Sequence, residues 1–195
     1  GNLYVHDRLL NENGKNIDSE RIAVFSPSGR FQEYLFEELH SDLDTQGENR
    51  NRLYSLMYLN SGLEMIRVEI DSFTLYRFEL SEARLEAVQT YRYENAYHEL
   101  MNFAIAPDGQ VYFSDKVGSL WQANANGSHV CLYDSTQHGD ENFYSIVTEL
   151  GCDADGRVIF NDVGLREIRR LLPDGSVETV IGRGEPMTEI PEDFN

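Results

Sequence analysis

Three aspartates end the same short pattern at three places along this chain. Asp7, Asp115 and Asp162 each close a seven-residue stretch that reads Gly, polar, apolar, aromatic or apolar, apolar, polar, Asp. Carboxylates that several repeats bring to one point supply the oxygen ligands that calcium prefers. The three aspartates are therefore candidate ligand-binding residues, with calcium as the candidate ion; no other cofactor is expected. The alternative is that each Asp caps a strand end or bonds the turn that follows it.

A cluster of tyrosines beside an arginine offers a second candidate site. Tyr91, Arg92, Tyr93 and Tyr97 lie close together in the sequence, between the second and third repeats. Tyr and Arg are enriched among the residues that carry most of the binding energy at interfaces. Tyr91, Arg92 and Tyr93 are therefore candidate ligand-binding residues. Because Tyr is also an ordinary strand residue, plain packing is the alternative.

Other arrangements that would signal catalysis are not found in the sequence. The five histidines share no metal-ligand spacing, and four of them are expected to be ordinary surface residues. The serines lack the Gly-x-Ser-x-Gly setting of a nucleophile elbow. No Gly-rich phosphate loop is present. We assign no catalytic residue, and whether any residue binds a metal stays open.

The repeat that contains the aspartates predicts the elements that position them. Gly109 and Gly156 open two copies 47 residues apart, and the pattern also opens the chain at Gly1. A second turn follows 18 or 19 residues after each later copy, at Asn126-Gly127-Ser128 and at Asp174-Gly175-Ser176. Asn-Gly and Asp-Gly favour tight hairpins. The unit is therefore a four-stranded antiparallel meander, and its repetition predicts an all-β protein built of propeller blades.

Four blades are predicted at residues 1–43, 44–97, 98–140 and 141–184, followed by an acidic tail at 185–195. In the third and fourth blades we expect strands at Met101–Ala106, Gln110–Ser114, Leu120–Ala123, His129–Tyr133, Ser145–Cys152, Arg157–Asn161, Glu167–Leu172 and Val177–Ile181. In the second blade we expect them at Arg52–Leu59, Glu64–Ile70, Thr74–Leu80 and Leu85–Tyr93. The first blade is incomplete: it begins at its second strand, Leu3–Asp7, and continues through a polar loop, Asn11–Ser19, to Arg21–Phe25 and Phe31–Phe36.

The composition excludes two classes of partner. The net charge of −18 over 195 residues disfavours nucleic acid and anionic membrane surfaces, since both attract basic proteins. No run of 18 or more apolar residues occurs, so membrane insertion is not expected. Cys131 and Cys152 are expected on strands too far apart for a disulfide, as two free and partly buried thiols.

The third and fourth repeats resemble known propeller families. Residues 155–162 with Ile168-Arg169-Arg170-Leu171 and Asp174-Gly175-Ser176 are similar to an NHL repeat. Residues 111–115 with Leu120-Trp121-Gln122-Ala123-Asn124 and Asn126-Gly127-Ser128 are similar to a YWTD blade. The resemblance covers about residues 100–182. It implies a β-propeller, and those families mainly bind proteins or ligands. They usually close a ring with six blades, which this chain does not supply.

Two functions follow from these observations. The favoured one is a non-catalytic module of a bacterial protein that recognises a protein or a small molecule, as an exported or cell-surface sensor or scaffold. The alternative is a metal-assisted lactonase or lyase of the gluconolactonase-like propeller type.

The open edges of the predicted blades also need a partner, because unpaired strand edges invite association. We expect either a homodimer or the continuation of a longer chain, each forming a larger ring, rather than a closed four-bladed monomer.

Overall fold

The computed structural model describes residues 1–10, 17–39, 52–59, 62–82, 84–94, 96–134 and 147–182, and in these residues the chain forms four antiparallel sheets. The first contains β1 (Leu3–Leu10), β2 (Ile17–Phe25) and β3 (Phe31–Leu39). The second contains β4 (Arg52–Leu59), β5 (Gly62–Val68), β6 (Ser72–Glu79) and β7 (Arg84–Arg92). The third contains β8 (Leu100–Ile105), β9 (Val111–Asp115), β10 (Leu120–Ala123) and β11 (His129–Tyr133). The fourth contains β12 (Val147–Cys152), β13 (Val158–Asp162), β14 (Glu167–Leu171) and β15 (Val177–Ile181).

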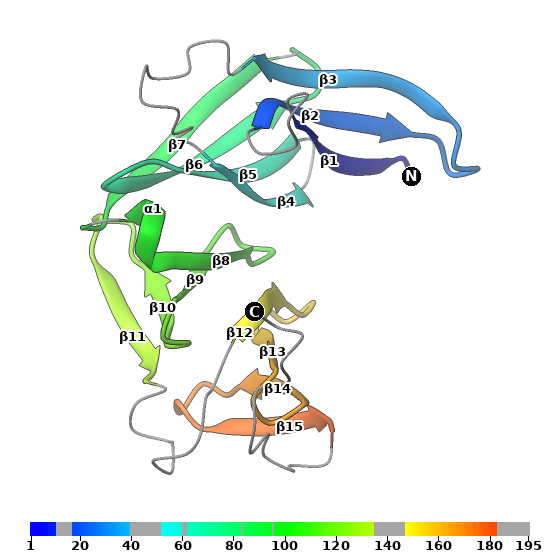
Figure 1. Cartoon of the computed structure of the whole chain (residues 1–195). Coiled ribbons are helices and arrows are strands. Elements are labelled where there is room, and N and C mark those ends of the chain that lie inside the picture. Colours follow the sequence, from blue (N-terminus) through cyan, green and yellow to red (C-terminus); the bar gives the residue numbers. More distant parts are fainter. Residues whose placement is uncertain are drawn as a thin grey trace.

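The sheets follow one another in chain order around an arc (Figure 1). Within each sheet the strands are hydrogen-bonded in sequence order, which is the meander of a propeller blade. The first strand of each complete sheet lies on the inner side of the arc, where β8 contacts both β4 and β12. The predicted all-β fold of consecutive antiparallel blades, with an incomplete first blade, is therefore confirmed. The exact blade limits and the tail at 185–195 stay predictions, and the tail lies outside the described residues.

Two details differ from the prediction. β1 runs to Leu10, beyond the predicted end at Asp7. β2 begins at Ile17, inside the stretch Asn11–Ser19 that was expected to be a loop. Leu9 and Leu10 extend the first strand, and they pair with Ser19 and Ile17, so the neighbouring strand lengthens with it. A four-residue helix, α1 (Ala96–Glu99), joins the second and third sheets and was not expected. It contains Ala and Glu, which are good helix formers, and is too short to show a periodic pattern.

The glycines of the repeat make the turns that the sequence indicated. Gly109 has φ 86° and Gly127 has φ 84°, in the left-handed region that other residues avoid. Each closes a tight turn with a backbone hydrogen bond, from Gly109 to Ala106 at 2.8 Å and from Gly127 to Asn124 at 2.9 Å. The turns fix the register of β8 with β9 and of β10 with β11.

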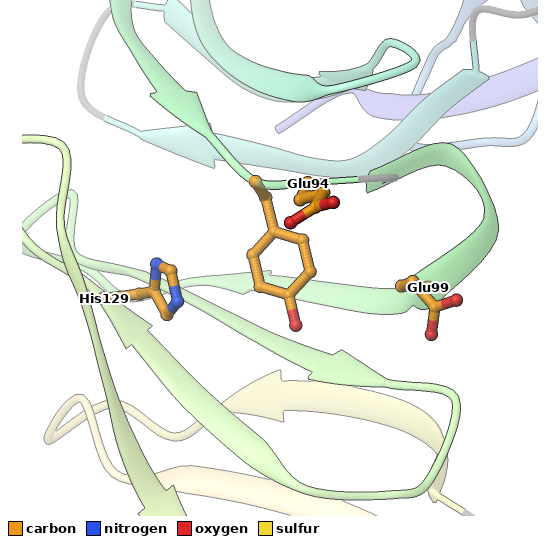
Figure 2. Close-up of a pocket in the computed structure, with 4 residues that line it drawn as sticks. Glu94, Glu99 and His129 are labelled. Carbon is orange, nitrogen blue, oxygen red and sulfur yellow. The ribbon is translucent and has the colours of Figure 1, made fainter.

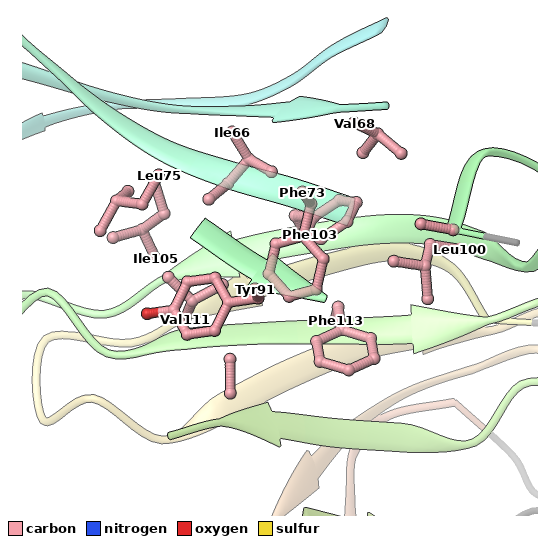
Figure 3. Close-up of a cluster of buried hydrophobic side chains, with 12 residues drawn as sticks. Ile66, Val68, Phe73, Leu75, Tyr91, Leu100, Phe103, Ile105, Val111 and Phe113 are labelled. Carbon is pink, nitrogen blue, oxygen red and sulfur yellow. The ribbon is translucent and has the colours of Figure 1, made fainter. Parts of the chain in front are cut away.

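Facing sheets bury their apolar side chains against each other. Between the second and third sheets lie the rings of Phe73, Phe103 and Phe113, with Phe73 at 5.2 Å from each of the other two (Figure 3). A second cluster around Phe160 joins the third and fourth sheets, and a third around Ile22 and Met65 joins the first and second. These cores hold each sheet at its place in the arc.

Both cysteines carry free thiols, but Cys131 is exposed rather than partly buried. It lies on the outermost strand of its sheet, β11, where no further strand covers it. In the described part of the chain, no helix is long and apolar enough to span a membrane.

Candidate functional site

The three repeated aspartates lie at matching places in their sheets. Asp115 ends β9, and its Oδ1 accepts the backbone N–H groups of Val117 at 3.1 Å and Ser119 at 2.9 Å. Its Oδ2 accepts the indole N–H of Trp121 at 2.9 Å. The carboxylate therefore closes the turn between β9 and β10 and fixes the first residues of the next strand.

Asp162 and Asp7 repeat this arrangement with a charged donor in place of the indole. Asp162 ends β13; it accepts the N–H of Leu165 at 3.2 Å and pairs with Nη1 of Arg169 on β14 at 3.2 Å. Asp7 on β1 pairs with Arg21 on β2. In all three sheets the donor comes from the strand that follows the aspartate. For Asp115 and Asp162 this is the turn-bonding role that we set against metal binding, whereas Asp7 lies inside β1 and makes a cross-strand ion pair. Whether the three also bind calcium stays a prediction.

The predicted tyrosine cluster divides into a core residue and a surface residue. Tyr91 is 6% exposed and its ring stacks on Phe73 at 4.8 Å between the second and third sheets. Arg92 ends β7 and is exposed. Tyr93 follows directly, is half-buried, and lines a hollow at the junction of the two sheets. The side chain of Tyr97 lies outside the described residues.

This hollow is called here the junction pocket. Its volume is ≈ 550 Å³ and its described lining consists of Tyr93, Glu94, Glu99 and His129. Figure 2 shows His129 and Glu99 on opposite sides of the view, with Glu94 between them. A pocket of this size accommodates a small ligand or one side chain of a larger partner.

Aromatic rings form one wall of the junction pocket. The ring of His129 lies 5.1 Å from that of Tyr93 and 5.3 Å from that of Trp121. Behind them, Phe113 makes an edge contact with Tyr93 at 5.6 Å. Because Phe113 is fully buried in the core between the sheets, the wall is anchored on the fold rather than on a loop.

The junction pocket has a negative local charge. Burial raises the pKa of Tyr93, and the charges of Asp115 and Glu99 raise it further, with a smaller effect from Cys131. Nζ of Lys116 pairs with Oε1 of Glu99 at 2.6 Å and offsets one of these charges. Glu94 is exposed at the rim.

Sequence reasoning missed two members of this pocket. His129 was expected to be a surface histidine and is exposed, but its place in the pocket was not foreseen. The signal that could have found it is strand alternation, since its cross-strand partner Ala123 shares a face with Trp121. Glu99 belongs to the unexpected helix α1. The described residues contain no group of three or more His, Cys, Asp or Glu side chains that could hold a metal ion.

A second hollow lies over the fourth sheet. Its volume is ≈ 300 Å³ and it is lined by Glu149, Leu150, Gly151, Cys152, Ile159, Phe160, Asn161 and Ile168. Ile168 and Ile181 pair across β14 and β15 and are 37% and 63% exposed. This end of the arc therefore presents apolar side chains to solvent.

Comparisons with known proteins define the class to which this fold belongs. The structure is similar to TolB from Acinetobacter baumannii, with TM-score 0.56 and 14% identity over 92% of this chain and 41% of that one. It is similar to the Malassezia sympodialis allergen Mala s 1, with TM-score 0.55 and 15% identity over 90% of this chain and 58% of that one. Virginiamycin B lyase from Staphylococcus aureus matches with TM-score 0.46 and 11% identity over 88% of this chain and 53% of that one.

TolB and Mala s 1 are propeller-type proteins, and the chain has the fold of propeller blades. It spans about two fifths to three fifths of the length of these structures. No protein-family model matches the sequence. No curated protein matches it either. The predicted propeller resemblance is thus confirmed at the level of the fold, and an NHL or YWTD relationship stays a prediction.

Proposed function

We propose that this chain is a non-catalytic recognition module that binds a protein or small-molecule ligand at the junction pocket. The observation that carries the proposal is the pocket itself. Its lining combines the rings of Tyr93 and His129 with the carboxylates of Glu94 and Glu99, around a volume of ≈ 550 Å³. Concave sites with aromatic walls and a few polar groups are the usual form of ligand sites. Tyr93 is also the one residue of the predicted tyrosine cluster whose described side chain lines a pocket.

The chemistry of the pocket favours recognition over catalysis. The ring of His129 contacts those of Tyr93 and Trp121 and so forms part of the aromatic wall. The carboxylate of Asp115 is fully engaged by Trp121 and two backbone N–H groups. Burial and nearby negative charge raise the pKa of Tyr93, which disfavours a phenolate that could act as a base. These groups are arranged to hold a ligand, and no described feature favours the metal-assisted lactonase or lyase.

We further propose that the module is exported or cell-surface and that its arc is completed by other blades. Support for completion comes from the apolar side chains Ile168 and Ile181 at the end of the arc and from the longer lengths of the matched propellers. The added blades come from a second copy or from a longer chain. Light scattering on the chain as given distinguishes these, because a stable dimer supports the first source and a monomer the second.

The test of the recognition function is a ligand screen followed by nuclear magnetic resonance. A panel of small acids, sugars, amines and short peptides is added to the 15N-labelled chain. Ligands should shift the amide signals of Tyr93, Glu94, Glu99 and His129. Tyr93→Ala and His129→Ala should weaken this binding, whereas Val130→Ala should not, because Val130 is 49% exposed on the opposite face of β11. A panel without effect on these signals, or catalytic turnover of a lactone that Tyr93→Ala abolishes, would contradict the proposal.

A further inference from the structure

The aromatic wall of the junction pocket presents a surface suited to a cation. The ring of His129 lies 5.1 Å from that of Tyr93 and 5.3 Å from that of Trp121. Tyr93 and Trp121 carry negative potential on their ring faces and attract ammonium groups placed over them. Tyr93 is partly exposed and lines the pocket, so part of its ring surface is accessible there, and Trp121 contacts the pocket through His129.

The carboxylates around the wall add to this potential. Glu94 and Glu99 lie on the lining, and Asp115 acts on the Tyr93 hydroxyl from behind it. The nearby cations are Lys116, which pairs with Glu99, and the exposed Arg92 at the end of β7. Three carboxylates thus stand against two basic groups, and the whole chain carries a net charge of −18. An anionic ligand would meet repulsion from both the site and the protein.

We propose that the junction pocket binds an alkylammonium group, held over the Tyr93 ring and neutralised by Glu94 and Glu99. This inference rests on the proposed recognition function and adds the chemical class of its ligand. The group has two sources with the same chemistry: a free quaternary or primary amine, or a lysine or methyllysine side chain of a basic partner protein. The volume of ≈ 550 Å³ exceeds what one ammonium head needs, and leaves room for the chain that carries it.

A pair of probes with the same shape and different charge tests the inference. Choline carries a trimethylammonium group, and 3,3-dimethyl-1-butanol is its uncharged carbon analogue. Trp121 is the single tryptophan of the chain, so its fluorescence reports on the pocket wall directly. We expect choline to bind about tenfold more tightly than the alcohol, in line with the strength of a partly desolvated cation–π contact. Binding should weaken as salt is raised, because the carboxylates are screened.

Variants separate the aromatic and acidic contributions. Tyr93→Ala should weaken choline binding about tenfold and Glu94→Gln about threefold. Glu178→Gln is the matched control: it removes the same charge from an exposed residue on β15, in another sheet, and should leave binding unchanged. An equal loss in Glu178→Gln would mean that net charge alone attracts the ion, and would overturn the inference.

The outcomes distinguish this inference from the function on which it rests. Equal or tighter binding of the uncharged alcohol at the pocket overturns the choice of a cation but supports a recognition site. Failure of every probe and of the wider ligand panel to affect Trp121, or the pocket amides, overturns both. A trimethyllysine peptide that binds at least tenfold more tightly than choline identifies a protein as the source of the ammonium group; comparable affinities identify a free amine.

Discussion

The indole N–H of Trp121 donates to Oδ2 of Asp115 across 2.9 Å, and this bond links the end of β9 to β10 beneath the junction pocket. Asp162 and Arg169 repeat the link in the fourth sheet at 3.2 Å. The same position in the repeat thus keeps its acceptor while the donor changes from an indole to a guanidinium. The aspartate specifies the connection between the second and third strands of a blade. The side chain that donates to it, Trp121 or Arg169, differs between the two sheets and changes the surface offered to neighbouring groups.

Asp115→Asn tests the role of this link. The amide can still accept the backbone N–H groups with its oxygen, but its NH2 group faces the indole N–H of Trp121 and leaves that donor unpaired. We expect a loss of about 1–3 kcal/mol in the free energy of unfolding. Urea titration followed by Trp121 fluorescence measures it. Asp108→Asn is the control: Asp108 is exposed and accepts one backbone N–H, from Gln110 at 3.0 Å, which Asn also accepts. Equal losses in both variants would contradict the assignment.

A double-mutant cycle on Asp162 and Arg169 tests the second link. Asp162 is 0% exposed, and Arg169 also lies 3.7 Å from Glu167 and over the Tyr133 ring at 5.9 Å. Asp162→Ala removes one acceptor of the Arg169 guanidinium and leaves it beside Glu167. Arg169→Leu leaves the buried Asp162 carboxylate without its guanidinium partner. We expect each single change to destabilise the fold and the pair to show a coupling energy of about 1–3 kcal/mol. Additive effects in denaturant titrations would show that the two residues do not act together.

Gly182→Ala probes the end of β15. Gly182 has φ 132°, and a Cβ added there would lie 2.7 Å from Cγ of Glu167 and 2.8 Å from the carbonyl oxygen of Arg166. Backbone strain and overlap together should cost about 2–4 kcal/mol. Gly151→Ala is the matched control on β12, where nothing lies within 4 Å of the added methyl, and should change stability by less than about 1 kcal/mol. Thermal unfolding of both variants decides the comparison.

Tyr91 and Tyr93 are close in sequence, and we expect opposite consequences from their removal. Tyr91→Ala deletes a ring that is stacked on Phe73 in the core, and should cost about 3–5 kcal/mol of stability. Tyr93→Ala deletes a partly exposed ring, and should cost less stability while abolishing ligand effects at the junction pocket. Unfolding midpoints and amide-shift titrations on both variants measure this. A larger stability loss in Tyr93→Ala would reverse the two roles.

The sequence predicted the blades well because their signals are local. Gly109 and Gly156 require a left-handed turn, and alternating apolar residues such as Val111 and Phe113 specify which face of a strand is buried. Each of these constraints acts within a few residues. The strand limits of the third sheet consequently agree with the prediction to within one residue.

The junction pocket could not be predicted in the same way because its members come from three different elements. Tyr93 follows β7, Glu99 ends α1 and His129 begins β11. Their proximity depends on how the second sheet packs on the third through Phe73 and Phe113, which is a long-range contact with no periodic signal. Tyr91 was assigned to the same binding cluster because composition alone does not distinguish a tyrosine in the core from one in a pocket.

The two cysteines should differ in reactivity and in their effect on stability at high pH. Burial, reinforced by Asp153 and Asp108, raises the pKa of Cys152 to about 12, whereas Cys131 is exposed and its pKa is raised less, mainly by partial burial. At pH 8 the thiolate fraction of Cys152 is then on the order of 10⁻⁴. Iodoacetamide should therefore modify Cys131 first, as mass spectrometry of a time course would show; faster labelling of Cys152 would contradict its burial.

The sign of the pH effect follows from the raised pKa of Cys152. The folded protein holds the proton up to about pH 12, while the unfolded chain releases it near its ordinary value of about 8.5. The thiol's contribution to the free energy of unfolding is thus fully present below about pH 8.5 and is lost as the pH rises toward 12. We expect the stability advantage of the native protein over Cys152→Ala to shrink from pH 8 to pH 11. Cys131→Ala serves as the control, and its difference from the native protein should change less over this range. A pH-independent difference for Cys152→Ala in urea titrations would show that the thiol is not protected by the packing between the third and fourth sheets.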